Sequence, residues 1–245
     1  MLRKILAAAV LAATALEANA SLTTGDIAFT SFNADEDGWS LVTFVDIDAN
    51  TSIFFSDNTW NGTSFNTTES FHTWNSGAAA ISAGSVIRFS AIDAASRSAS
   101  IGSLTGSGSN FGMSATNETI YAYLGSNIST PTTFLTGVSS EGTASLSTAG
   151  LIAGVNAVAL TNSTDYAEFI GVRAGAATFG DYRAAVNNAA NWNILVGGAQ
   201  EGQIPNTASF SVIPASVPLP AAGWMFLSVT GLFGCLSRRR TVQIA

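Results

Sequence analysis

The chain has 245 residues, a formal net charge of −7 and a single cysteine, Cys235. Between residues 21 and 216 it carries fifteen acidic residues, four arginines and no lysine, a net charge of −11, which disfavours nucleic acids and anionic lipids as partners. Because this stretch contains no cysteine, it forms no disulfide, and its stability has to come from a hydrophobic core. A length of about 195 residues is sufficient for such a core.

The first twenty residues have the three parts of a secretory signal peptide. Arg3 and Lys4 form a short basic start, residues 5–16 form an apolar core, and Ala18 and Ala20 form a small-x-small cleavage site. The apolar core is too short to span a bilayer as a helix. We therefore predict a signal peptide over residues 1–20 and export of the remaining chain.

The body of the chain, residues 21–213, has the pattern of many short strands. Glycine, serine, threonine, asparagine and alanine dominate, and aromatic and β-branched residues recur throughout, which is typical of extracellular β proteins. Strands are predicted over residues 26–32, 40–46, 51–56, 71–74, 85–91, 119–124, 157–160 and 209–212. One short helix is predicted over residues 181–190, with Asp181 as its N-cap. The predicted fold class is all-β, an antiparallel β-sandwich.

The sequence allows more detailed predictions for three stretches of the body. In residues 120–124 the two tyrosines alternate with apolar residues, so they are predicted to share one face of a strand. Residues 94–110 are rich in serine and glycine and predict a long exposed loop or a loose hairpin. Residues 137–154 are similar, with Leu146, Leu151 and Ile152 as the side chains that would hold them to the body.

The opening of the body resembles a known kind of domain. Gly25-Asp26-Ile27-Ala28-Phe29 and, further on, Ile53-Phe54-Phe55-Ser56-Asp57 look like the start of a β domain that recurs in secreted bacterial surface proteins. That domain is loosely similar to lamin-tail and immunoglobulin-like sandwiches. The resemblance covers about the first third of the body, supports the fold class and implies no activity.

Clustered carboxylates are the candidate metal ligands of the body. The candidates are Asp35, Asp37, Asp46, Asp48 and Asp57. The first two share an acidic turn, the next two are predicted on one strand face, and the last follows a strand. Hard oxygen ligands of this kind suit calcium, although the spacing of an EF-hand is absent. Solvated turn carboxylates are the alternative interpretation.

Catalytic chemistry has few candidates in the sequence. A serine triad needs a histidine base, and His72 is the only histidine. Because no serine lies in a Gly-x-Ser-x-Gly turn, the sequence favours a packed strand histidine. Paired carboxylates with tryptophan platforms for sugars remain an alternative, as does packing of the same tryptophans in the core. Those tryptophans are Trp39, Trp60, Trp74 and Trp192. We predict no catalytic residue and no cofactor, with calcium left open.

The C-terminal end has three parts in a fixed order. Residues 214–220 form a proline-containing linker that ends in Val217-Pro218-Leu219-Pro220, where the prolines favour an extended backbone. Residues 221–237 contain no charge and predict a single transmembrane helix. Residues 238–245 form a basic tail that the positive-inside rule keeps in the cytoplasm. The anchor and its stop include Ala221, Trp224, Leu236, Arg238, Arg239 and Arg240.

This order of motif, apolar run and arginines resembles the PEP-CTERM sorting signal, in a Val-Pro-Leu-Pro variant. The resemblance covers residues 217–240, and Leu219 replaces the glutamate that is usual between the two prolines. It implies that an exosortase, a membrane-embedded transpeptidase or protease, cuts the chain near the motif after export. A plain anchor that is never cut is the alternative.

The resulting hypothesis is an exported, non-enzymatic protein of the cell envelope or extracellular matrix. Its predicted partners are the export machinery, an exosortase, transiently the inner membrane, and the exopolysaccharide among which it would have a structural or adhesive role. The matrix role is what the sorting resemblance implies. The alternatives are a secreted carbohydrate-active hydrolase that uses paired carboxylates, and a calcium-dependent sugar-binding module.

Overall fold

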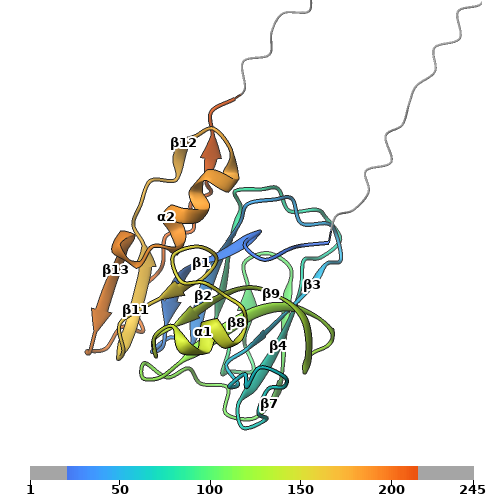
Figure 1. Cartoon of the computed structure of the whole chain (residues 1–245), viewed down its shortest axis with the longest axis vertical. Helices are drawn as coiled ribbons and strands as arrows, with labels where there is room; N and C mark the ends of the chain where they lie inside the picture. The colour runs from blue at the N-terminus through green and yellow to red at the C-terminus, as the bar shows by residue number, and fades with distance from the viewer. Residues whose placement is uncertain (1–20, 215–245) are drawn as a thin grey trace, which may run out of the picture. The chain divides into compact units, whose positions relative to one another are not determined.

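The computed structural model describes residues 21–214, which form two six-stranded β-sheets that pack against each other (Figure 1). The predicted signal peptide, sorting motif, membrane anchor and basic tail lie outside the described residues. Within residues 21–214, no helix has the length and apolar character needed to cross a membrane. The compact unit ends at Val212.

The first sheet has the strand order β13-β11-β1-β2-β5-β6, and all its neighbouring strands are antiparallel. Its strands are β1 (Ile27–Asn33), β2 (Gly38–Thr43), β5 (Val86–Ser90), β6 (Ser98–Ala99), β11 (Thr164–Phe169) and β13 (Trp192–Val196). The predicted strands at β1, β2 and β5 are confirmed, whereas β6, β11 and β13 were not predicted. β11 and β13 lie at one side of the sheet, and β6 forms the opposite edge.

The second sheet has the order β10-β9-β8-β3-β4-β7. Its strands are β3 (Ser52–Ser56), β4 (Ser70–Asn75), β7 (Ser103–Gly108), β8 (Thr119–Asn127), β9 (Thr130–Ser139) and β10 (Val158–Ala159). Its pairs are antiparallel except β9 with β10, and a separate parallel pair joins β12 (Ala174–Ala176) to β14 (Ser211–Val212). The purely antiparallel prediction is therefore corrected to a mainly antiparallel fold with two short parallel pairs.

Helices are few and short in the described chain. They are α1 (Ala144–Thr148), η1 (Phe179–Tyr182), α2 (Arg183–Asn187) and η2 (Ala189–Asn191). The single helix predicted over residues 181–190 is thus three consecutive short turns. Asp181 is not the N-cap: it lies in the first turn, where its Oδ2 accepts a hydrogen bond from the Thr178 N–H at 2.7 Å.

The main core lies between the two sheets and is built around aromatic side chains. Phe55 of β3 is fully buried, with its ring centroid 5.2 Å from that of Trp39 on β2 and 5.1 Å from that of Phe89 on β5. Trp39 and Phe89 are cross-strand neighbours in the first sheet, so Phe55 bridges the layers. This packing follows from the alternation of side chains along each strand.

A second, smaller core covers the outer face of the second sheet. Tyr121 and Tyr123 lie on this face with Phe65, Leu146 and Leu151, which confirms that the tyrosines share one face of β8. Leu146 and Leu151 are buried, as predicted, and they hold α1 and the following turn against the sheet. Ile152 is 59 % exposed, so its predicted packing role was wrong.

The serine- and glycine-rich stretch 94–110 is more ordered than its composition predicted. It contains β6 and β7, and β7 pairs with β4 along its whole length. Gly102 makes the corner between them with φ of +79°, and a Cβ there would lie 2.1 Å from the Asn75 carbonyl oxygen. The prediction of a long exposed loop is therefore wrong. Main-chain pairing holds this stretch in the sheet, and most side chains of β7 are exposed.

Replacing Phe55 by alanine is expected to cost about 3–5 kcal/mol of the free energy of unfolding, because it leaves a cavity between the sheets. The matched control is Phe54→Ala on the same strand. Phe54 is half-buried and packs on the opposite face, against Tyr123 at 5.8 Å. Its loss is expected to cost roughly 1–2 kcal/mol. Urea unfolding of both variants measures this, and equal losses would contradict the placement of the main core.

Candidate functional site

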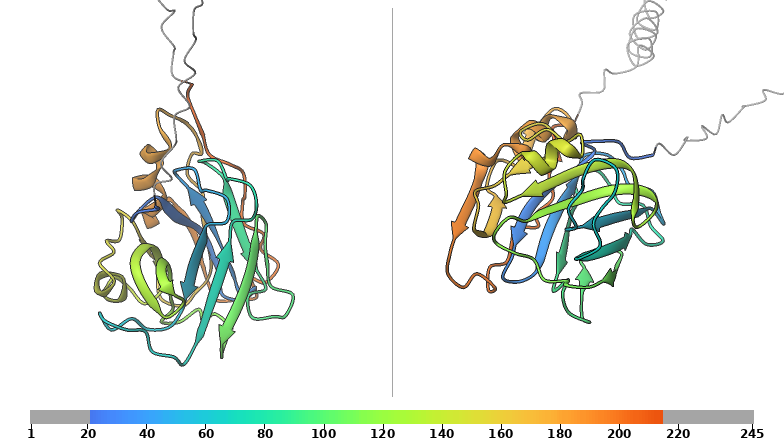
Figure 2. Two further views of the ribbon diagram at one scale, coloured as in Figure 1. Left: turned by 90° about the vertical axis from the view of Figure 1, so that its right-hand side faces the viewer. Right: turned by 60° about the horizontal axis from the view of Figure 1, so that its bottom comes forward.

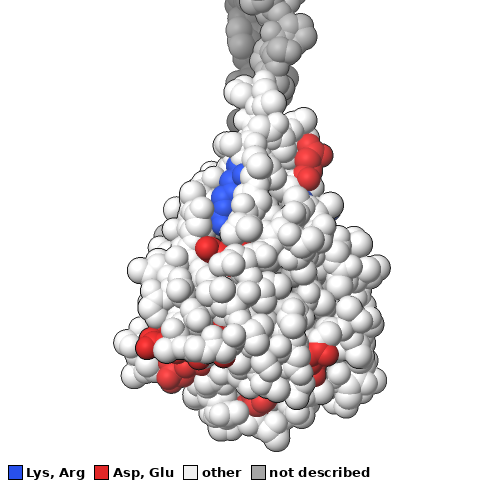
Figure 3. Space-filling model, turned by 90° about the vertical axis from the view of Figure 1, so that its left-hand side faces the viewer, with Lys and Arg blue, Asp and Glu red and all other residues white. Residues whose placement is uncertain are grey.

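The loops at the two ends of the sandwich differ in charge. Following the strands in turn, the connections after β1, β3, β5, β7, β9 and β13 emerge at one end. Most carboxylates of the described chain lie at this end, which we call the acidic end: Asp35, Glu36, Asp37, Asp57, Glu69, Asp93, Glu118, Glu141, Asp165 and Glu201. On the face shown in Figure 3, most acidic side chains likewise lie in the lower part, and the surface is otherwise largely uncharged.

A buried chain of polar groups connects Asp57, Ser70 and His72 at the acidic end. Because β3 ends at Ser56 and β4 begins at Ser70, the hairpin register brings Asp57 opposite Ser70. The Ser70 N–H donates to Asp57 Oδ1 at 2.9 Å, and the Ser70 hydroxyl lies 3.1 Å from both carboxylate oxygens. The same hydroxyl lies 3.1 Å from His72 Nε2. All three residues are buried.

This chain contains the residue types of a serine triad but not its geometry. In a triad the histidine lies between the serine and the carboxylate and takes the serine proton. Here Ser70 lies between Asp57 and His72, and His72 Nδ1 has no hydrogen-bond partner among the described residues. When Asp57 is ionised, the Ser70 hydroxyl donates to it and His72 Nε2–H donates to Ser70. In that arrangement His72 Nε2 does not accept the Ser70 proton.

A small pocket adjoins this chain inside the sandwich. Its walls are Trp39, Ser56, Asp57, Ser70, His72, Ile92, Met113 and Ile120. The space between these side chains is too small to hold a water molecule. No substrate reaches Ser70 or His72 in this conformation.

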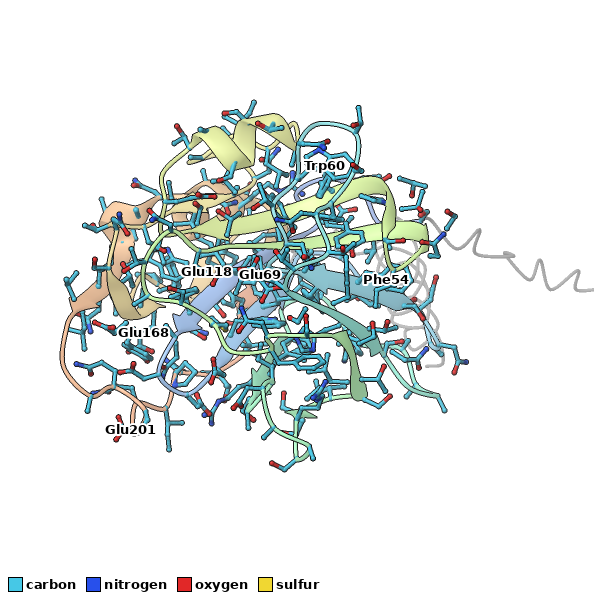
Figure 4. All side chains as sticks on the ribbon, turned by 90° about the horizontal axis from the view of Figure 1, so that it is seen from below. Phe54, Trp60, Glu69, Glu118, Glu168 and Glu201 are labelled. Carbon is cyan, nitrogen blue, oxygen red and sulfur yellow. The ribbon has the colours of Figure 1, made fainter. Side chains whose placement is uncertain are left out.

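Glu118 is a second buried carboxylate at the acidic end. It lies immediately before β8 and is 5 % exposed, and its Oε2 accepts a hydrogen bond from the Ser114 N–H at 2.8 Å. Burial raises the pKa of Glu118 to about 8, with further increases from Asp57 and Glu69, against the lowering effect of the Ser114 hydrogen bond. Figure 4 looks at this end from below and shows Glu69 and Glu118 near its middle.

Burial also shifts the pKa values of Asp57 and His72. It raises the pKa of Asp57 to about 7, with an added increase from the neighbouring Glu69. It lowers the pKa of His72 to about 4, with a further decrease from the Arg97 charge. Both shifts favour the neutral form, as expected for ionisable groups away from water. At neutral pH these shifts leave His72 neutral and Asp57 and Glu118 partly or mostly protonated.

The five aspartates predicted as calcium ligands do not come together. Asp35, Asp37 and Asp57 lie at the acidic end, whereas Asp46 and Asp48 lie at the opposite end. The strand face predicted for the latter pair is wrong, because β2 ends at Thr43 and the two aspartates flank an isolated bridge. Among residues 21–214, no group of three or more histidine, cysteine, aspartate or glutamate side chains is arranged to hold a metal ion.

Instead, these carboxylates tie loops to one another through main-chain amides. Asp35 Oδ2 accepts from the Gln200 N–H at 2.6 Å, and Asp46 Oδ1 accepts from the Ala83 N–H at 2.7 Å. Asp37 Oδ1 accepts from the N–H of Met113. The structural role of these three aspartates is therefore to accept hydrogen bonds from main-chain N–H groups of loops that are not paired in a sheet.

The four tryptophans considered as sugar platforms are mostly interior. Trp39, Trp74 and Trp192 are buried, and the Trp74 indole N–H donates to the Ile101 carbonyl at 2.8 Å. Trp60 is half-buried and packs on Phe65 and Phe134, with centroid distances of 5.0 and 5.2 Å. None of them forms the wall of an open cleft beside the buried carboxylates, so packing is the better interpretation.

Two members of the buried site, Ser70 and Glu118, were not singled out from the sequence. Ser70 lies 13 residues after Asp57 in the chain and meets it through the register of the β3–β4 hairpin. Glu118 joins it because the stretch before β8 folds over the end of the sandwich. The one signal in the sequence was the placement of His72 between aromatic neighbours in a strand.

Comparisons with protein-family models, with curated proteins and with solved structures gave no match for this chain. The two resemblances drawn from its sequence therefore stay predictions.

Proposed function

We propose that this protein is exported, held briefly in the inner membrane by its C-terminal helix, and then released or re-anchored at the cell surface by an exosortase. There it has a structural or adhesive role in the exopolysaccharide matrix and no catalytic role. One observation carries this proposal: Val217-Pro218-Leu219-Pro220, an uncharged run and three arginines follow one another at the end of a chain that begins with a signal peptide pattern.

The arrangement of the described domain is compatible with this role and supports it. β1 begins at the end of the sandwich opposite the acidic end, and β14 lies toward that same end, where the Phe210 N–H donates to the Gly84 carbonyl (Figures 1 and 2). The described domain therefore carries most of its acidic loops at the end away from β14 and from the start of β1. It also has a large core without any disulfide, so it does not depend on oxidative folding after export.

The buried site supports a non-catalytic role over the hydrolase alternative. A glycosidase needs two carboxyl groups about 5–9.5 Å apart on either side of an open substrate cleft. Asp57 and Glu118 are instead buried, and the pocket beside Asp57 has no room for water. The calcium-dependent alternative has little support, because the candidate aspartates lie at opposite ends of the domain.

The test is mass spectrometry of the mature protein recovered from its native host. We expect an N-terminus at Ser21 and a C-terminus near residues 217–220, without the apolar run and the arginines. The intact sequence through Ala245 in the mature surface protein would refute processing by an exosortase. Recovery of the full chain, leader included, from the cytosol would refute export.

A further inference from the structure

β7 forms one border of the second sheet, and its outer edge is largely bare main chain. The strand pairs with β4 along its whole length, and among residues 21–214 no strand pairs with its other side (Figure 1). Its sequence is Ser-Leu-Thr-Gly-Ser-Gly, so its side chains are uncharged and mostly small. Leu104 packs into the main core, and the other residues of the strand are exposed. A second extended chain can therefore approach this edge closely.

The hydrogen bonds of β4 show which main-chain groups of β7 are free. The N–H of Ser70, the first residue of β4, donates to Asp57 and its C=O accepts from Asn58, so its main chain points toward β3. Because this direction alternates along a strand, every second residue of β4, starting at Phe71, bonds β7. The remaining residues of β7 direct their N–H and C=O groups away from the sheet, without a hydrogen-bond partner among residues 21–214. These residues are Leu104, Gly106 and Gly108.

The chain around β7 is free of carboxylates. From residue 94 to residue 117 it contains no aspartate or glutamate, and its one charge is Arg97. Two copies of a domain with fifteen acidic residues and four arginines repel each other least where they meet through such a side. Glu69 precedes β4 and lies beside the end of β7 at Gly108. An antiparallel pairing of two β7 strands therefore sets the two copies of Glu69 at opposite ends.

The other long border strand, β13, has acidic neighbours. The strand next to it, β11, carries Asp165 and Glu168, and Glu168 lies opposite Asn193 of β13. Asp165 also accepts a hydrogen bond from the N–H of Gly197, directly after β13. Joining two copies through β13 places both pairs of carboxylates one strand spacing, about 5 Å, from the joint. Charge therefore favours β7 over β13 as the edge at which copies meet.

We propose that two copies of this chain associate through β7, antiparallel and about a two-fold axis at Gly106. In this register the free groups of Gly106 bond those of the second Gly106, and the free groups of Leu104 bond those of Gly108, which gives about six main-chain hydrogen bonds. The side chains also fit, because Leu104 faces a glycine and Thr105 faces Ser107. The second sheets of the two copies become one continuous sheet. This association does not depend on the export and sorting proposed above.

Disulfide trapping in the full chain tests this register. In a Cys235→Ser background, Thr105→Cys and Ser107→Cys are made in separate proteins, which are purified, mixed in detergent and treated with a mild oxidant. Positions 105 and 107 of different copies form a non-hydrogen-bonded pair with Cα atoms about 4.5 Å apart, which suits a disulfide. Two copies of the same variant hold their thiols on a diagonal, about 7–8 Å apart, which does not.

We expect the mixture to form the disulfide-linked dimer at least about tenfold faster than either variant alone, as measured on non-reducing gels. Asn193→Cys, an exposed position on β13, is the control and is expected to show only the slow rate. Association through the apolar C-terminal run is common to all these proteins and gives equal rates, so equal rates overturn the proposal. The same oxidation in cells of the native host identifies the occupant of the edge. A link from position 105 to a different protein, in place of a second copy, also overturns it.

A second measurement needs no added cysteine. Thr105→Glu with Ser107→Glu sets like charges opposite each other across the joint, and Thr105→Lys with Ser107→Lys does the same with the other sign. Sedimentation of the full chain is expected to show that each variant alone associates roughly tenfold more weakly, and that an equimolar mixture of the two regains the association. Both positions are exposed, so the thermal unfolding midpoint is expected to stay unchanged. No loss in the single variants, or no recovery in the mixture, contradicts pairing through β7.

Discussion

The free energy of unfolding is expected to fall as the pH rises from about 6.5 to 8. The pKa values of Asp57 and Glu118 are raised from 3.8 and 4.5 to about 7 and about 8, so in this range the folded protein binds more protons than the unfolded chain. In this range a carboxyl group that is protonated in the folded protein and ionised in the unfolded chain lowers the free energy of unfolding by about 1.4 kcal/mol for each pH unit of increase. Both groups contribute up to about pH 7, and Glu118 alone above it.

His72 has the opposite effect in a lower range. Its pKa is lowered from 6.5 to about 4, so between these values the unfolded chain binds the extra proton and stability rises with pH. Below pH 6.5 this increase partly cancels the loss of stability caused by Asp57 and Glu118. The free energy of unfolding therefore falls most steeply just above pH 6.5. Urea unfolding at half-unit steps of pH measures the curve. Asp57→Asn with Glu118→Gln should flatten it above pH 6.5, and an unchanged slope in that variant would assign the effect to other groups.

Pro220→Ala is expected to leave nearly all of the chain uncut in the membrane fraction. The sorting hypothesis requires an extended segment that the processing enzyme binds along its backbone, and proline fixes φ for that shape. Immunoblots of membrane and extracellular fractions measure the ratio of precursor to mature protein.

Pro214→Ala is the matched control for that variant, because it removes a proline of the same linker outside the motif. It is expected to be processed normally. Normal processing of Pro220→Ala itself would show that the motif is not what the enzyme reads. Failure of both variants would indicate that the linker as a whole, and not the motif, is required.

The sequence predicted those strands whose side chains alternate or are strongly apolar. β1, β3 and β8 have this pattern, and the two faces of β8 were assigned correctly from Tyr121 and Tyr123. β7 and β9 were missed because glycine, serine and threonine carry little hydrophobic pattern. Their place in the sheet is decided by main-chain pairing with β4 and β8, which the sequence does not display.

The buried site was even harder to predict from the sequence, because its residues meet only through long-range structure. His72 was recognised as a packed strand residue, but Asp57 was considered only as a metal ligand in a solvated turn. It is buried because the hairpin register sets it opposite Ser70, in a pocket that Trp39, Ile92 and Met113 also line. Glu118 became part of the site only through the path of residues 109–118. No local pattern marks either carboxyl group as buried.

The strands that border the two sheets limit how copies of this protein can associate. Two of the four borders, β6 and β10, are only two residues long. Such short strands offer few free main-chain groups to a neighbouring molecule. At the two six-stranded sheets, strand addition between copies is therefore confined to β7 and β13, which gives the described domain few routes to fibrous aggregation.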